Sequence, residues 1–111
     1  MNYNDAIKLL TSQGKFYINL GLDRMQQILN LLGNPQEGLK CIQVAGTNGK
    51  GSVCTMLDSI LRTAGFKTGL YTSPHIFEYT ERIKISGVDI SKQDFANYTK
   101  QITILADKNN I

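Results

Sequence analysis

The chain is poor in the residues from which metal centres and disulfide frameworks are built. Its 111 residues include two cysteines, one histidine, two prolines and no tryptophan. Common zinc-site patterns need a second close cysteine pair or nearby histidines, so Cys41 and Cys54 are expected to be small core side chains. The sequence also lacks the roughly 20-residue apolar run of a membrane helix and the charged and apolar regions of a signal peptide. We therefore expect a cytoplasmic protein without a membrane span.

Charge of one sign is not concentrated anywhere in the sequence. Twelve Lys and Arg residues against nine Asp and Glu residues give a net charge of +3, and the basic residues are scattered. Nucleic-acid binders carry a clustered basic stripe, so DNA and RNA are unexpected partners, whereas anionic small molecules such as ATP fit this charge. A composition with 41% hydrophobic and 19% charged residues is that of one ordinary globular domain.

A glycine-rich segment stands between a β-branched run and a helical pattern. The run Cys41–Ala45 is predicted to be a short buried strand, and apolar residues from Val53 onward recur at helical spacing. A turn in this place lets backbone N–H groups surround an anion at the start of a helix. The sequence thus predicts an ATP phosphate site, with Lys50 on the outer phosphates, formed by Gly46, Thr47, Asn48, Gly49, Lys50, Gly51 and Ser52.

This segment departs from the standard P-loop pattern at two positions. Val44 occupies the place of the first glycine, and Gly51 follows the lysine where serine or threonine is usual. The alternative interpretation is a surface turn of glycine and asparagine with a solvated lysine.

The order of predicted elements indicates an α/β protein with a P-loop-type parallel sheet flanked by helices. Strand, crossover helix and strand form a βαβ unit, which requires parallel strands. Two or three strands make a thin sheet with open edges, so we expect the first part of a longer enzyme. The predicted helices cover residues 5–11, 22–32, the stretch after the glycine segment and a stretch starting at residue 91. The predicted strands cover residues 41–45 and 67–72, and residues 83–88 are predicted to be a short strand or an extended hairpin.

Ser73 follows the second predicted strand, at the edge where a parallel sheet presents its ligand crevice. Its hydroxyl could bind a Mg²⁺ ion that bridges ATP phosphates, because Mg²⁺ prefers oxygen ligands. A Ser-Pro turn that ends the strand is an equal alternative. The neighbouring His75, a lone histidine, is expected to be structural or exposed.

The segment Gly46–Ser52 matches the G-T-N-G-K-G-S variant of the Mur ligase superfamily, and the chain resembles its folylpolyglutamate synthase and dihydrofolate synthase branch. The resemblance implies the N-terminal portion of an ATP-binding domain over residues 1–111, with Ser73 as a Mg²⁺ ligand. It also implies a pteroate pocket lined by Gly21, Leu22, Asp23 and Arg24. The alternative for the last two is the first turn of a helix, where an acid complements the dipole.

Glu81 and Arg82 resemble the T-E-R-I stretch of the same family. The functional interpretation is an anchor for the loop near the substrate crevice. The alternative is a surface ion pair, which stabilises little.

The family resemblance further implies a reaction and its substrates. A folate or dihydropteroate carboxylate attacks the γ-phosphate of ATP, and L-glutamate captures the acyl phosphate, while Lys50 stabilises charge. The parent enzyme is expected to be monomeric, and this chain alone is expected to form no amide. Two alternatives remain: a stand-alone nucleotide-binding module and a truncated, non-catalytic remnant.

Overall fold

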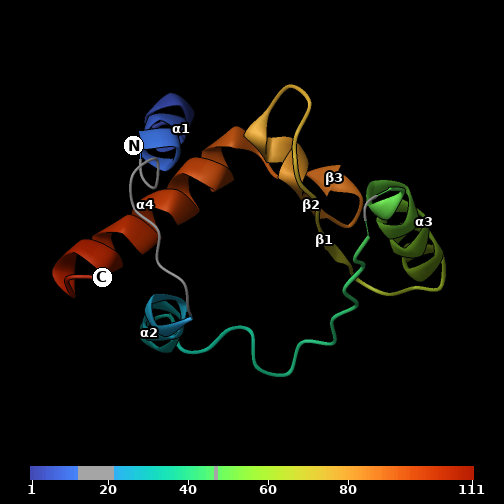
Figure 1. Ribbon diagram of the computed structural model, residues 1–111, viewed down its shortest axis with the longest axis horizontal. Coiled ribbons are helices and arrows are strands. Elements are labelled where there is room, and N and C mark those ends of the chain that lie inside the picture. The colour runs from blue at the N-terminus through green and yellow to red at the C-terminus, as the bar shows by residue number, and fades with distance from the viewer. Residues whose placement is uncertain (13–21, 47) are drawn as a thin grey trace. The chain divides into compact units, whose positions relative to one another are not determined.

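The computed structural model describes residues 1–12, 22–46 and 48–111, and Figure 1 traces its elements. The described chain forms two compact units, residues 1–40 with 93–111, and residues 41–92. In chain order the elements are α1 (Tyr3–Ser12), α2 (Asp23–Leu31), α3 (Lys50–Thr63), β1 (Gly69–Tyr71), the 3-10 helix η1 (Tyr79–Arg82), β2 (Ile83–Ile85), β3 (Val88–Asp89) and α4 (Lys92–Lys108).

The first unit consists of α1, α2 and α4, and all three helices confirm predicted ones. Asn2 and Asp5 cap the start of α1 reciprocally, since the Asp5 N–H donates to Asn2 Oδ1 at 2.8 Å and the Asn2 N–H donates to Asp5 Oδ2 at 3.2 Å. Tyr3 of α1 meets Phe95 of α4 edge to face, with ring centroids 5.6 Å apart. A small aromatic core therefore joins the first and last helices of this unit.

The second unit is built on an antiparallel sheet in the order β1-β2-β3. Gly69 pairs with Ile85 and Tyr71 pairs with Ile83. Ser86 and Gly87, with φ of +50° and +84°, form the tight turn between β2 and β3. The hairpin predicted from residues 83–88 is confirmed, as is the strand within residues 67–72.

The predicted parallel sheet is wrong for the described residues. Residues 41–45 form no strand, and Ile42 is 65% exposed. A strand needs a neighbour to satisfy its backbone groups, and β1 pairs with β2, which follows η1 and lies antiparallel to it. The βαβ unit therefore lacks its first strand, although α3 begins within the glycine segment, at Lys50, and contacts β1.

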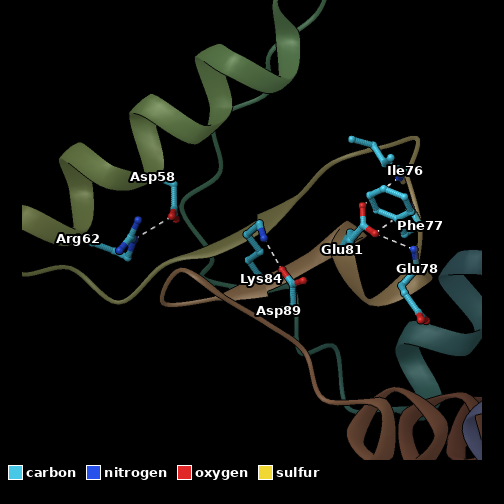
Figure 2. A network of polar contacts seen from close by, with 8 residues as sticks. All are labelled: Asp58, Arg62, Ile76, Phe77, Glu78, Glu81, Lys84 and Asp89. Atoms are coloured by element: carbon cyan, nitrogen blue, oxygen red, sulfur yellow. Dashed lines mark hydrogen bonds and ion pairs between the residues drawn. The ribbon is translucent and has the colours of Figure 1, made fainter.

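Helix α3 carries a charged pair of its own beside the hairpin (Figure 2). Arg62 Nε donates to Asp58 Oδ2 at 2.9 Å, and Asp58 is only 6% exposed. A Cβ atom on Gly87 would stand 2.7 Å from the Arg62 guanidinium carbon, so the guanidinium lies directly over the hairpin turn. A side chain at Gly87 would displace the guanidinium and would have to adopt φ of +84°, a conformation that favours glycine.

The environment of Asp58 favours its ionised form. The Thr68 hydroxyl and then the Arg62 guanidinium hold the pKa of Asp58 below its ordinary value of 3.8, against the opposing effect of burial. Within the described residues, the buried Thr68 hydroxyl oxygen makes no hydrogen bond that meets the usual distance and angle limits. Arg62, whose Nε lies 2.9 Å from Asp58 Oδ2, is therefore the main partner of Asp58.

Candidate functional site

The glycine loop, residues 46–52, leads directly into helix α3. Gly49 precedes the helix with φ of +76°, a left-handed conformation that glycine adopts without strain. Lys50 is the first helical residue, and the Val53 N–H donates to the Gly49 carbonyl at 3.0 Å. The N–H groups at positions 50–52 come before this bond, in the first turn, where a helix has no carbonyl of its own to offer. They are suited to an external anion.

The loop closes back on its lysine. Gly46 has φ of +147°, and a Cβ atom placed there would lie 3.9 Å from Lys50 Cγ and 4.0 Å from the Asn48 carbonyl oxygen. Lys50, Gly51 and Ser52 are exposed. One cation, a hydroxyl and free backbone amides therefore meet at an open helix start, which is chemistry for binding an anion. Thr47 lies outside the described residues.

Ser73 belongs to the serine loop, residues 72–78, which follows β1. It is exposed, and the N–H of the preceding Thr72 donates to the Arg82 carbonyl at 2.9 Å, continuing the β1–β2 ladder by one bond. The short connection over residues 64–68 joins α3 to β1, and the two elements are in contact. The serine loop and the glycine loop are thus joined to two elements that pack on each other in the second unit.

Glu81 holds the serine loop through three backbone amides (Figure 2). Its Oε1 accepts from the Ile76 N–H at 2.9 Å, and its Oε2 accepts from the N–H groups of Phe77 at 2.9 Å and Glu78 at 2.7 Å. These bonds, that from Ile76 foremost, lower the pKa of Glu81 from its ordinary value of 4.5. The anchor interpretation of Glu81 has the support of this geometry, since its carboxylate binds loop amides.

Arg82 braces the same loop through a side chain. Its Nε donates to His75 Nδ1 at 2.8 Å, and its guanidinium lies 4.8 Å from the centre of the Tyr79 ring. The His75 and Tyr79 rings are 4.2 Å apart. His75 thus accepts a hydrogen bond in a stacked cluster, in agreement with the structural role expected for a lone histidine.

The predicted pteroate-pocket residues belong to the first unit. Leu22 is the residue before α2 and is 68% exposed, while Asp23 and Arg24 form the first turn of that helix. An acid at this point complements the helix dipole, so the local geometry suits the structural alternative as well. Gly21 lies outside the described residues. The structure brings the glycine loop and Ser73 into one unit and leaves this segment in the other.

The described residues offer few donors for a metal ion. The described residues contain no group of three or more His, Cys, Asp or Glu side chains suited to a metal ion. A Mg²⁺ ion typically takes one or two protein oxygens together with phosphate oxygens and water. The Ser73 hydroxyl could be one such protein oxygen for a metal ion that arrives with a nucleotide. It could not by itself hold a metal ion that has no phosphate ligands.

Sequence reasoning missed two parts of this arrangement. The Asp58–Arg62 pair has the i,i+4 spacing of a helical ion pair, and Glu78 and Glu81 have capping-box spacing and do form such a box at η1. Either spacing was available as a signal.

In the described part of the chain, no helix combines the length and the apolar character that crossing a membrane requires.

The known proteins compared below with this chain are folylpolyglutamate and dihydrofolate synthases. No protein-family profile matches the chain. The dihydrofolate synthase/folylpolyglutamate synthase of Bacillus subtilis is 38% identical over 100 residues, which is 90% of this chain and 23% of that protein. The chain spans 12 to 23% of the length of the first curated relatives that it matches.

Solved structures extend the similarity to the fold. A complex of FPGS with AMPPCP and folate has a TM-score of 0.88 at 32% identity, over 97% of this chain and 26% of that one. The bifunctional folylpolyglutamate synthase/dihydrofolate synthase of Yersinia pestis, complexed with AMPPNP and a Mn ion, has a TM-score of 0.84 at 36% identity, over 94% of this chain and 25% of that one. The resemblance predicted from the sequence is confirmed, and the chain is a homologue of a short segment of the folylpolyglutamate synthases and dihydrofolate synthases.

Proposed function

We propose that this chain is part of an ATP-dependent amide ligase that joins L-glutamate to a folate or to dihydropteroate. Its own contribution is to bind the ATP phosphates at the glycine loop, residues 46–52, and the accompanying Mg²⁺ at Ser73. The observation that carries the proposal is the exposed Lys50 at the first position of α3, directly after the left-handed Gly49.

Three features of the glycine loop have a defined part in this proposal. The N–H groups of the first turn of α3 donate hydrogen bonds to the phosphate oxygens, since these amides and the helix dipole both favour an anion. Lys50 neutralises charge on the outer phosphates while the substrate carboxylate attacks the γ-phosphorus. The bond from that phosphorus to the β–γ bridging oxygen breaks, and ADP leaves. Gly46 and Gly49 allow backbone angles that a side chain would oppose.

Related proteins support the choice of nucleotide, metal and second substrate. One related structure contains AMPPCP and folate, and another contains AMPPNP and a Mn ion. When bound, the metal would neutralise phosphate charge, and Ser73 would supply one oxygen ligand. Phosphoryl transfer depends mainly on positioning and charge neutralisation, and this chain needs no covalent nucleophile for that part.

Calorimetric titration of the chain with AMPPCP and Mg²⁺ tests the nucleotide site. We expect saturable binding that Lys50→Ala weakens by about tenfold or more, because a charge-assisted hydrogen bond contributes roughly 1.5–3 kcal/mol. Lys100→Ala is the matched control, since Lys100 is also an exposed helical lysine but lies on α4. Equal affinity of the two variants would refute the assignment of Lys50.

Product formation separates nucleotide binding from ligation. We expect the chain to form no dihydrofolate from ATP, dihydropteroate and L-glutamate. Mass spectrometry of that mixture checks this, and a dihydrofolate peak above the control without protein would contradict the expectation. The proposal keeps the segment Leu22–Arg24, with Gly21, as the part that contacts the pteroate group. Because this chain is expected to form no product, Arg24→Ala tests that contact in a related enzyme that completes the ligation.

A further inference from the structure

Three features of the second unit surround Ser73 in the chain. Thr72 on one side is tied to the Arg82 carbonyl by a bond of 2.9 Å. His75 on the other side accepts from Arg82 Nε at 2.8 Å. From Ile76 onward the next three amides all bind Glu81. Ser73 therefore lies in a short stretch between two fixed residues, Thr72 and His75. Both of these residues are hydrogen-bonded to Arg82, the last residue of η1.

We propose that Glu81 is a positioning residue that holds the Ser73 hydroxyl in place for a nucleotide-bound divalent cation. Glu81 does not touch the cation in this proposal; it acts through the backbone of the serine loop. The inference rests on the metal role of Ser73 in the proposed function.

A carboxylate suits this task better than any neutral side chain. One carboxylate has two oxygens and several lone pairs and accepts all three N–H groups at once, with distances of 2.7 to 2.9 Å. Glutamine would present one oxygen and one NH₂ donor, so in either orientation its NH₂ group would face at least one of these N–H donors. The isosteric change Glu81→Gln therefore breaks the clamp with little change in volume.

The loop has a physical need for such a clamp. Ile76 and Phe77 are 81% and 86% exposed, so apolar packing does little to fix their position. A loop that lacks buried contacts opens locally at low free energy. The three charge-assisted bonds to Glu81 replace the missing packing and limit the positions open to Ser73, as Figure 2 makes visible for residues 76–78.

Manganese binding to the AMPPCP-loaded chain is the decisive readout. Free Mn²⁺ is measured by electron paramagnetic resonance during titration of the wild-type chain, Glu81→Gln, Ser73→Ala and the double variant. We expect Glu81→Gln to weaken Mn²⁺ binding by about tenfold, as loss of an outer-shell partner does, while AMPPCP affinity without metal stays unchanged. Glu37→Gln, an exposed glutamate of the first unit, should match the wild type.

The double variant distinguishes positioning from general destabilisation. If Glu81 acts through Ser73, Glu81→Gln has no further effect once Ser73 is alanine, and the two changes are not additive. Additive losses would overturn the proposal, and so would a Glu81→Gln affinity equal to that of the wild type. Should Glu81→Gln fail to fold, Glu81→Asp takes its place, because the shorter side chain cannot reach all three amides. It should lose affinity in the same direction, and no loss would overturn the proposal.

The proposed function and this inference fail in different ways. A wild-type chain that binds no AMPPCP refutes the nucleotide site, and the role of Glu81 falls with it. A wild-type chain that binds AMPPCP and Mn²⁺, with Glu81→Gln binding both equally well, refutes only the role of Glu81.

Discussion

The glycine loop and the serine loop belong to the same unit but are held in opposite ways. The glycine loop is shaped by backbone angles, with Gly46 and Gly49 at φ of +147° and +76°. The serine loop is shaped by side chains of η1, since Glu81 and Arg82 together make four hydrogen bonds to it. The first should therefore be sensitive to added side chains, and the second to the loss of one charge.

A branched side chain at Gly49 is the strongest way to break the glycine loop. Gly49→Val places a β-branched residue at φ of +76°, which costs about 1–3 kcal/mol of folding free energy. We expect urea unfolding to show that loss, together with weaker AMPPCP binding. Gly51→Ala is the control, because Gly51 is helical with open space at its Cβ position. Its stability should stay within about 1 kcal/mol of the wild type, and a larger loss would contradict this view of the loop.

Acid should weaken the serine loop, because the carboxylate of Glu81 is what holds it. The pKa of Glu81 is lowered in the folded protein, so its bonds contribute fully above its ordinary value of 4.5 and are lost as pH falls through the lower folded value. We expect the unfolding free energy of the wild type to decrease below about pH 4.5, and Glu81→Gln to show a smaller decrease. Asp58 follows in the same direction from 3.8. Parallel pH curves for the two proteins would contradict the clamp.

The Asp58–Arg62 pair sharpens the comparison, because it lies within α3, the helix that follows the glycine loop, and beside the hairpin turn at Gly87. Asp58→Asn keeps the size of the side chain but removes the charge that pairs with Arg62. We expect a lower thermal midpoint, without a selective loss of Mn²⁺ affinity. A selective loss of metal binding at unchanged midpoint would assign Asp58 to the site instead of the scaffold.

The smallest effect is expected beside the serine loop itself. Lys92 Nζ lies 3.4 Å from Glu78 Oε1, and both side chains are exposed, at 59% and 44%. Exposed pairs of this kind contribute about 0–1 kcal/mol, so Lys92→Gln should leave urea unfolding nearly unchanged. A loss above about 1 kcal/mol would show that the serine loop has a second clamp comparable to Glu81.

Local signals predicted the helices well. The start of α3 follows from a glycine-rich segment before a helical apolar pattern, and Gly33, which has φ of +84°, follows the end of α2. The turn at Gly87 could also be predicted, because the apolar residues on both sides alternate. These features depend on neighbours within a few residues, which the sequence displays directly.

Pairing between strands was not predictable in the same way. Cys41–Ala45 has the composition of a buried strand, but a strand exists only with a partner, and β1 pairs with β2. The three amides that bind Glu81 come together only after η1 folds the chain back. For that reason the family resemblance suggested that Glu81 and Arg82 anchor a loop, without indicating which backbone groups Glu81 binds.

Amide chemical shifts give the most direct test of the central claim, that the glycine loop wraps a triphosphate. Titration of the ¹⁵N-labelled chain with AMPPCP and Mg²⁺, with AMP for comparison, reports which amides meet the nucleotide. We predict large shifts for residues 46–52 with AMPPCP and much smaller ones with AMP, because the outer phosphates supply the contacts. Equal shifts with both nucleotides, or shifts confined to residues outside 46–52, would contradict the account.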